Sequence, residues 1–94
     1  MKIELDEARL QGLRAFLERC EDTEQLSERE YVVDLYDIQR PVTLNLVFVR
    51  GGIGIDGAAE LKYDDEQNGW YMGERLADAG QVLSALEEAG AWQA

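Results

Sequence analysis

The stretch that decides the fold is "VFVRGGIGIDGAAELKYDD", residues 47–65. It begins with strand-forming residues and then contains Gly52-Ile53-Gly54-Ile55-Asp56-Gly57, which has the letters of the dinucleotide-binding pattern G-x-G-x-x-G. That pattern works only when a helix follows and points its N-terminus at the pyrophosphate. Residues 58 to 63 instead alternate between apolar and polar with a period of two, which is typical of a strand. We therefore expect no bound dinucleotide.

The glycines of this stretch are better explained as turn residues. Gly51-Gly52 can form a two-residue hairpin turn, and Asp56-Gly57 can form a second turn or a bulge. The residues before them alternate through Val42, Leu44, Leu46 and Phe48, which is strand periodicity. We expect residues 42 to 63 to form paired antiparallel strands, with no helix beginning at Gly54 or Gly57.

Helices are predicted at both ends of the chain. Residues 7 to 20 carry leucines at steps of three and four, and Asp6 is the expected N-cap. A second helix is expected to begin near Asp78, which has capping-box spacing to Gln81, and to stop at Gly90.

Between these helices, the segments other than the decisive stretch favour strands and turns. The segment "YVVDLYDI", residues 31–38, favours a strand, and the acidic residues 20 to 30 favour a connector. Asn68-Gly69 is a hairpin signal, and "WYM", residues 70–72, supplies the returning strand. These elements predict an α+β fold: an antiparallel three- to four-stranded β-meander with an N-terminal and a C-terminal helix packed on one face. Residues 1–94 are expected to form a single compact domain.

Composition excludes several kinds of chemistry. The sequence has no histidine, which removes Ser-His and Cys-His nucleophile pairs and the commonest transition-metal ligand. Cys20 is the only cysteine, so neither an intrachain disulfide nor a cysteine-based zinc site is expected. The absence of an apolar run of about 20 residues predicts a cytoplasmic protein with no membrane partner. A formal net charge of -11 predicts repulsion of nucleic acid, so a charged partner should be a basic protein.

One loop has part of a cation-binding pattern. Asp64, Glu66, Asn68 and Gly69 match the first half of a calcium loop, but Arg75 stands where the bidentate glutamate belongs. The simpler interpretation is a solvated hairpin tip, and the sequence leaves open whether the loop binds a cation. We expect no catalytic residue, no resident metal and no cofactor.

Carboxylates are dense between residues 18 and 37, in a segment that we call the acidic tract: Glu18, Glu21, Asp22, Glu24, Glu28, Glu30, Asp34 and Asp37. Such a row could imitate the phosphates of duplex DNA, which carries a charge about every 1.7 Å along its axis. Tryptophan and tyrosine are typical of interface hot spots. The predicted partner-binding residues are therefore Glu21, Asp22, Glu24, Glu28, Glu30, Asp34, Asp37, Trp70, Tyr71 and Trp92.

These features predict a non-enzymatic, acidic protein-binding module that acts as a stoichiometric inhibitor or DNA mimic on a basic, nucleic-acid-handling protein. In size and charge alone, the chain resembles small phage-encoded inhibitors of bacterial defence enzymes, including anti-CRISPR and anti-restriction proteins. The alternative is a structural or adaptor subunit, self-associating or chaperone-like, for which a homodimer is possible. An acidic surface that serves only solubility remains a third explanation of the charge.

Overall fold

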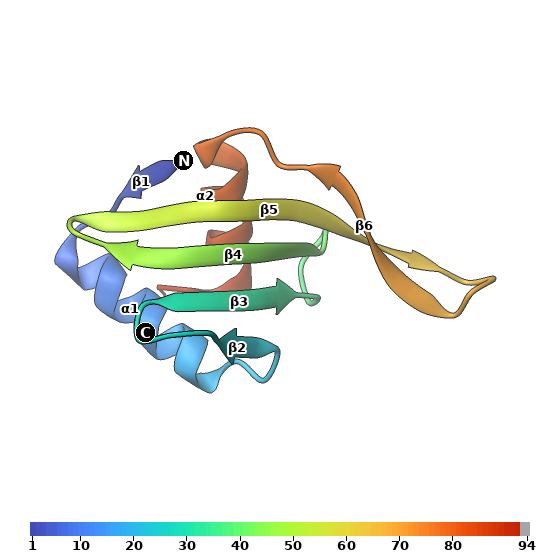
Figure 1. Cartoon of the computed structure of the whole chain (residues 1–94), viewed down its shortest axis with the longest axis horizontal. Coiled ribbons are helices and arrows are strands. Elements are labelled where there is room, and N and C mark those ends of the chain that lie inside the picture. Colours follow the sequence, from blue (N-terminus) through green and yellow to red (C-terminus); the bar gives the residue numbers. More distant parts are fainter. Residues whose placement is uncertain (93–94) are drawn as a thin grey trace.

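The computed structural model describes residues 1–92, so residues 93 and 94 of the predicted domain lie outside the described residues. The fold is α+β, with two helices and an antiparallel sheet (Figure 1). The helices are α1 (Glu7–Arg19) and α2 (Ala79–Ala89), and the strands are β1 (Lys2–Glu4), β2 (Thr23–Gln25), β3 (Glu30–Leu35), β4 (Val42–Val49), β5 (Gly52–Asp64) and β6 (Gly69–Arg75). The predicted α+β class is confirmed. The predicted number of three to four strands is wrong, because the sheet has six.

The sheet is built around the long strand β5. Its order is β1-β5-β4-β3-β2, and β6 also pairs with β5. The pairing of β4 with β5 ends at Glu60, whereas β6 continues to pair with β5 as far as Asp64. The two strands therefore leave the sheet as a two-stranded ribbon, which we call the arm and define as residues 61 to 72. The arm projects beyond the end of β4 (Figure 1), and the molecule measures 44 × 26 × 24 Å.

The decisive stretch forms two paired strands, as predicted, and no helix begins at either later glycine. Val49 pairs with Gly52, so the reversal uses Arg50 and Gly51 and not the predicted Gly51-Gly52. Gly51 takes the left-handed φ of 77° that this turn requires. Of the two alternatives for Asp56-Gly57, the bulge is correct. The register shifts there, and Asp56 has no partner in β4.

Gly52 has a different role, because it allows β1 to approach β5. A Cβ atom on this residue would lie 2.1 Å from the carbonyl oxygen of Ile3. The neighbouring backbone contacts extend the same edge, since the N–H of Leu5 donates to the Gly51 carbonyl and that of Ile55 to the Met1 carbonyl. The glycine that the letter pattern places first is therefore needed for close strand packing and not for phosphate.

One buried cluster joins both helices to the sheet. Leu13 and Leu17 of α1 and Val82 and Leu86 of α2 belong to the same core as alternate residues of β3, β4 and β5. Figure 1 shows both helices behind the sheet in this view. Full burial of each such aliphatic side chain is worth about 2 kcal/mol, so this layer supplies most of the driving force for folding.

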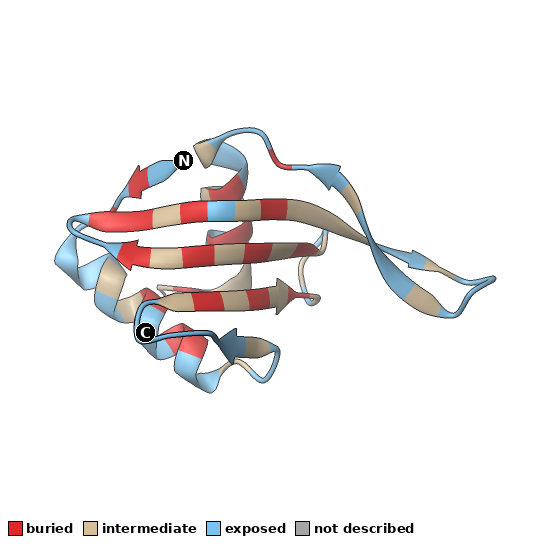
Figure 2. Cartoon of the chain, viewed as in Figure 1, coloured by how far each residue is buried: buried red, intermediate tan, exposed pale blue. Residues whose placement is uncertain are grey.

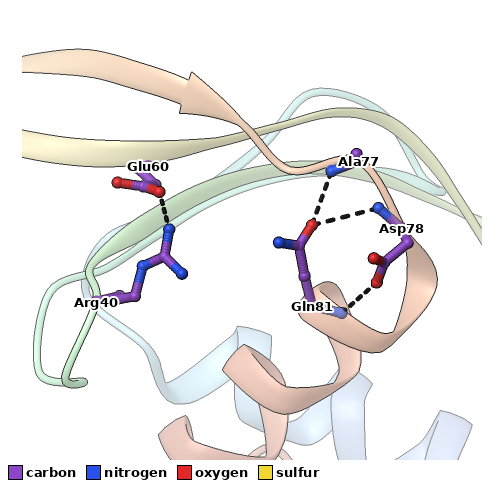
Figure 3. A network of polar contacts seen from close by, with 5 residues as sticks. All are labelled: Arg40, Glu60, Ala77, Asp78 and Gln81. Carbon is purple, nitrogen blue, oxygen red and sulfur yellow. Dashed lines mark hydrogen bonds and ion pairs between the residues drawn. The ribbon is translucent and has the colours of Figure 1, made fainter.

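Both helices begin and end as the sequence predicts. The Asp6 side chain accepts a hydrogen bond from the Arg9 N–H, and α1 ends at Arg19, one residue before the predicted end. At α2, Asp78 accepts from the Gln81 N–H at 2.9 Å, and the Gln81 side chain accepts in return from the backbone N–H of Asp78 (Figure 3). Gly90 closes the helix with a φ of 85°. Neither helix within residues 1–92 has the length and apolar character of a membrane span.

Candidate protein-binding surface

The arm is held in shape by its turn and by edge-to-face and tilted contacts between aromatic rings. The reversal occupies residues 65 to 68, because Gly69 already pairs with Asp64, so the turn lies just before the predicted Asn68-Gly69 pair. Asn68 ends the turn with a φ of 53°, and its side chain accepts a hydrogen bond from the Tyr63 hydroxyl. The Trp70 ring lies between two tyrosines, with centroid distances of 5.3 Å to Tyr63 and 5.0 Å to Tyr36. Because an isolated two-stranded ribbon is marginally stable, the contact with Tyr36 fixes the arm to the end of β3.

Large apolar side chains are exposed along this arm. The exposed fractions are 45% for Tyr63, 47% for Trp70, 52% for Tyr71 and 68% for Met72. Tyr63 and Trp70 are register partners on one face of the ribbon, and Tyr71 points to the other face because strand side chains alternate. Figure 2 shows no buried residue on the ribbon that leaves the sheet. Exposed aromatic residues beside polar surface are typical of the anchors of protein interfaces.

Part of the acidic tract gathers beside the arm. Asp22, Asp34 and Asp37 line the same small cavity, of about 150 Å³, as Tyr36. The backbone N–H of Asp34 donates to the Asp22 carbonyl, which holds the two residues together across the β2–β3 pair. The hairpin therefore brings residues twelve and more positions apart in the sequence to one corner of the sheet.

Tyr36 joins these carboxylates to the aromatic rings. Its hydroxyl donates a hydrogen bond of 3.3 Å to Oδ2 of Asp34. Partial burial raises the pKa of the Tyr36 hydroxyl above its ordinary 10.0, and the charges of Asp34 and Asp22 raise it further. Both carboxylates thus act on a group that also contacts Trp70. We call the combined set the arm site: Asp22, Asp34, Tyr36, Asp37, Tyr63, Trp70 and Tyr71.

The remaining acids of the tract lie along the hairpin and at its far end. Glu24 of β2 pairs with Val32, in the middle of the hairpin. Glu30 is opposite Val47, at the other end of β3, and Glu28 is exposed in the turn before it. Glu18 and Glu21 are exposed at the end of α1 and in the following turn. The structure therefore brings only three of the predicted acids to the arm.

Trp92 lies apart from the arm site. Its ring is 5.5 Å from the Arg9 guanidinium, and a Cβ on Gly12 would come within 3.3 Å of its backbone. The side chain is partly buried and packs against the core. The role of Trp92 in partner binding stays a prediction.

Few of the carboxylates are neutralised. Among residues 1–92 the one ion pair joins Arg40 to Glu60 (Figure 3). The arginines of α1 lie over aromatic rings and not beside acids: Arg9 over Trp92, Arg14 over Phe48 and Arg19 over Phe16. The negative charge of the arm site is therefore left facing solvent.

The loop with the partial calcium pattern makes a turn. One oxygen of Asp64 accepts hydrogen bonds from the backbone N–H groups of Glu66 and Gln67. Within the described part of the chain, no group of three or more cysteine, aspartate and glutamate side chains is arranged to hold a metal ion. The Asp64 carboxylate thus serves the local turn geometry.

Tyr36, Tyr63 and Met72 belong to this surface but were not among the predicted binding residues. The alternation of Ala59, Leu61 and Tyr63 indicates a strand with an apolar face. This alternation does not reveal that the pairing of β4 with β5 ends at Glu60 of β5. The end of that pairing leaves the apolar face of the arm uncovered.

Comparison of the chain with protein-family models, curated proteins and solved structures finds no match. A functional proposal therefore depends on the geometry and charge described above.

Proposed function

We propose that this protein is a non-enzymatic, acidic module that binds a basic protein through the arm site. The observation that carries the proposal is the contact of Tyr36 with both Trp70 and Asp34, which makes one surface of exposed aromatic rings and unpaired carboxylates. Aromatic residues supply the buried anchors of an interface. Carboxylates that no ion pair neutralises attract and orient a positively charged partner.

The acids of the hairpin favour a partner that handles nucleic acid. Glu24 is the register partner of Val32, which lies halfway between Glu30 and Asp34 on β3. These three carboxylate positions share one face and are spaced by about 6.6 Å along the strand direction, at about 3.3 Å per strand residue, with Glu24 displaced sideways by one strand spacing of about 4.8 Å. A row of negative charges of this kind can occupy a groove built for phosphates. The module would then be a stoichiometric inhibitor and DNA mimic, of the anti-defence or anti-CRISPR type, acting in the cytoplasm.

A second function is favoured by the uncharged middle of this same sheet face. On the face turned away from the buried cluster, β3 and β4 carry Val32, Thr43, Asn45 and Val47, which are partly exposed and uncharged and lie beside Glu30 and Asp34. A self-associating or adaptor subunit would use such a face. Light scattering separates the two functions: a homodimer retained at high salt supports the adaptor, and a monomer supports the acidic module.

The acidic module is tested by affinity capture with a matched control. The immobilised protein is exposed to a lysate of the organism that encodes it and washed with a rising salt gradient. We expect a basic, nucleic-acid-binding protein to elute as salt rises, because screening weakens contacts between exposed charges. Trp70→Ala should lose the captured protein. Leu26→Ala should keep it, since Leu26 has a similar exposed fraction of 49% against 47% but lies off the arm.

Two results would contradict this proposal. One is a captured protein whose retention does not change with salt. The other is equal capture by wild type and Trp70→Ala, which would separate the arm from partner binding.

A further inference from the structure

The face of the sheet turned away from the core contains a hollow. Figure 2 shows this face toward the viewer, with the helices behind it. The hollow has a volume of about 490 Å³. It is lined by side chains from four strands: Val32 of β3, Thr43 and Asn45 of β4, Gly57, Ala58 and Ala59 of β5, and Met72, Gly73 and Arg75 of β6.

Small residues create this space. Gly57 and Ala59 line it where larger strand residues would fill it, and nothing lies closer than 3.8 Å to a Cβ placed on Gly57. Gly73 also lines it, but a Cβ on Gly73 would meet the Lys62 side chain at 3.0 Å. Val32 and Met72 supply apolar walls. Met72 is also part of the arm and shares a face with Trp70, so the hollow is continuous with the arm face that carries Trp70.

Its polar groups are few and specific. Oδ1 of Asn45 is buried and has no hydrogen-bond partner among residues 1–92. A buried acceptor without a hydrogen bond lowers the stability of the folded protein. The terminal torsion of an asparagine side chain has a broad energy minimum, so the amide can rotate and bring Oδ1 toward a ligand. Arg75 lines the hollow and forms no ion pair within the described residues, and no carboxylate lines it. Although the chain has a formal net charge of -11, a cationic side chain that entered this hollow would find no carboxylate to pair with.

We propose that the hollow receives one aromatic side chain with an N–H or O–H donor, a tryptophan or tyrosine, from the partner protein. The ring would pack on Gly57 and Ala59 beside Val32, with its face available to the Arg75 guanidinium. The N–H or O–H group of the aromatic side chain would donate a hydrogen bond to Oδ1 of Asn45. This inference rests on the proposed function, because it names the residue type by which the partner of the arm site is anchored.

The test needs no partner, so its result is independent of the capture experiment. The protein is titrated with indole, 1-methylindole and N-acetyltryptophanamide, and backbone amide shifts are followed by NMR. We expect saturable shifts at Gly57, Ala59 and Gly73 with a dissociation constant on the order of 1 mM. Indole should bind about fivefold more tightly than 1-methylindole, which is the ratio that one hydrogen bond supplies. N-acetyltryptophanamide carries the indole ring on a peptide backbone, as a tryptophan of the partner would. It should therefore bind to the hollow at least as tightly as indole.

Two variants assign the contacts. Ala59→Phe fills the hollow and should abolish the shifts caused by all three compounds. Asn45→Val removes the side-chain amide and with it the acceptor, so this variant should bind indole and 1-methylindole equally. Val49→Ala, on the same face but outside the hollow, should bind like wild type.

Three outcomes would overturn the proposal. Absence of saturable shifts at the three named amides would remove the site. Binding of indole without N-acetyltryptophanamide would indicate a small-molecule site and not a docking site. A preference for indole that survives in Asn45→Val would show that Asn45 is not the acceptor. If the hollow fails this test while Trp70→Ala still loses the captured protein, the proposed function stands and only the anchor is wrong.

Discussion

Replacing Gly52 with alanine tests how the decisive stretch builds the sheet. The new Cβ would lie 2.1 Å from the Ile3 carbonyl oxygen and 3.0 Å from the Glu4 Cα. Both are backbone atoms of β1, so no side-chain rotation relieves the clash. Gly52 is also paired with Val49 on its other side. Because β1 is three residues long and pairs only with β5, it is the element that must move.

The expected cost follows from these contacts. Overpacking a close contact typically costs about 1–3 kcal/mol, and a backbone obstacle places this variant at the upper end. Movement of β1 would also expose Ile3, whose exposed fraction is 4%, and burial of an isoleucine is worth about 2 kcal/mol. We therefore expect Gly52→Ala to lower the free energy of unfolding by about 3 kcal/mol.

Urea unfolding, followed by tryptophan fluorescence and circular dichroism, measures this change against two glycine controls. Gly57→Ala should change the free energy of unfolding by no more than about 0.5 kcal/mol, because the nearest atom is 3.8 Å from its Cβ. A Cβ on Gly51 would meet no atom within 4 Å, but Gly51 has a left-handed φ. Gly51→Ala should therefore lower the free energy of unfolding by about 1 kcal/mol. If Gly52→Ala is no more destabilising than Gly57→Ala, the assigned packing of β1 on β5 is wrong.

Three further predictions concern other parts of the chain. Asp78→Ala removes the α2 N-cap and should lower the free energy of unfolding by about 1 kcal/mol in urea; an unchanged value would contradict the role of the cap. The pKa of Tyr36 is raised above 10.0, so its contribution to stability is complete below pH 10 and is lost as pH rises through the raised value. Asp34→Asn should lower that pKa in an ultraviolet titration, and no change would argue against the hydrogen bond. Trp70→Ala should speed amide hydrogen exchange in the arm and leave β4 protected, whereas equal rates in the two proteins would contradict anchoring of the arm by Tyr36.

The elements that local chemistry encodes could be predicted from the sequence. Asp6, Asp78 and Gly90 cap the two helices at the predicted ends, because capping depends on residues within one turn. The hairpin that Asn68-Gly69 predicts is present, although its turn occupies residues 65 to 68 and Gly69 already belongs to β6. Strand periodicity identified β3, β4 and most of β5, since a half-buried strand must alternate.

What depends on contacts distant in sequence could not be predicted. β1 and β2 are too short for any periodicity, and each exists only because a longer strand offers its edge. The turn falls at Arg50 and Gly51 because β1 needs Gly52 for close packing, which no local pattern reveals. The same is true of the candidate site. Its three acids, Trp70 and Tyr71 were predicted, but Tyr36 and Tyr63 were not, and the meeting of these groups at Tyr36 depends on where β4 stops pairing with β5.

The central claim is that carboxylates beside the arm attract the partner. The most direct test is the salt dependence of the dissociation constant between this protein and its purified captured partner, with two charge-matched variants. Asp22→Asn combined with Asp37→Asn removes two charges beside Tyr36, whereas Glu7→Gln combined with Glu87→Gln removes two exposed charges from the helices. We predict that the first pair weakens binding about tenfold at low salt and flattens the salt dependence, and that the second pair changes neither. Equal effects of the two pairs, or a wild-type dissociation constant that does not change with salt, would contradict the claim.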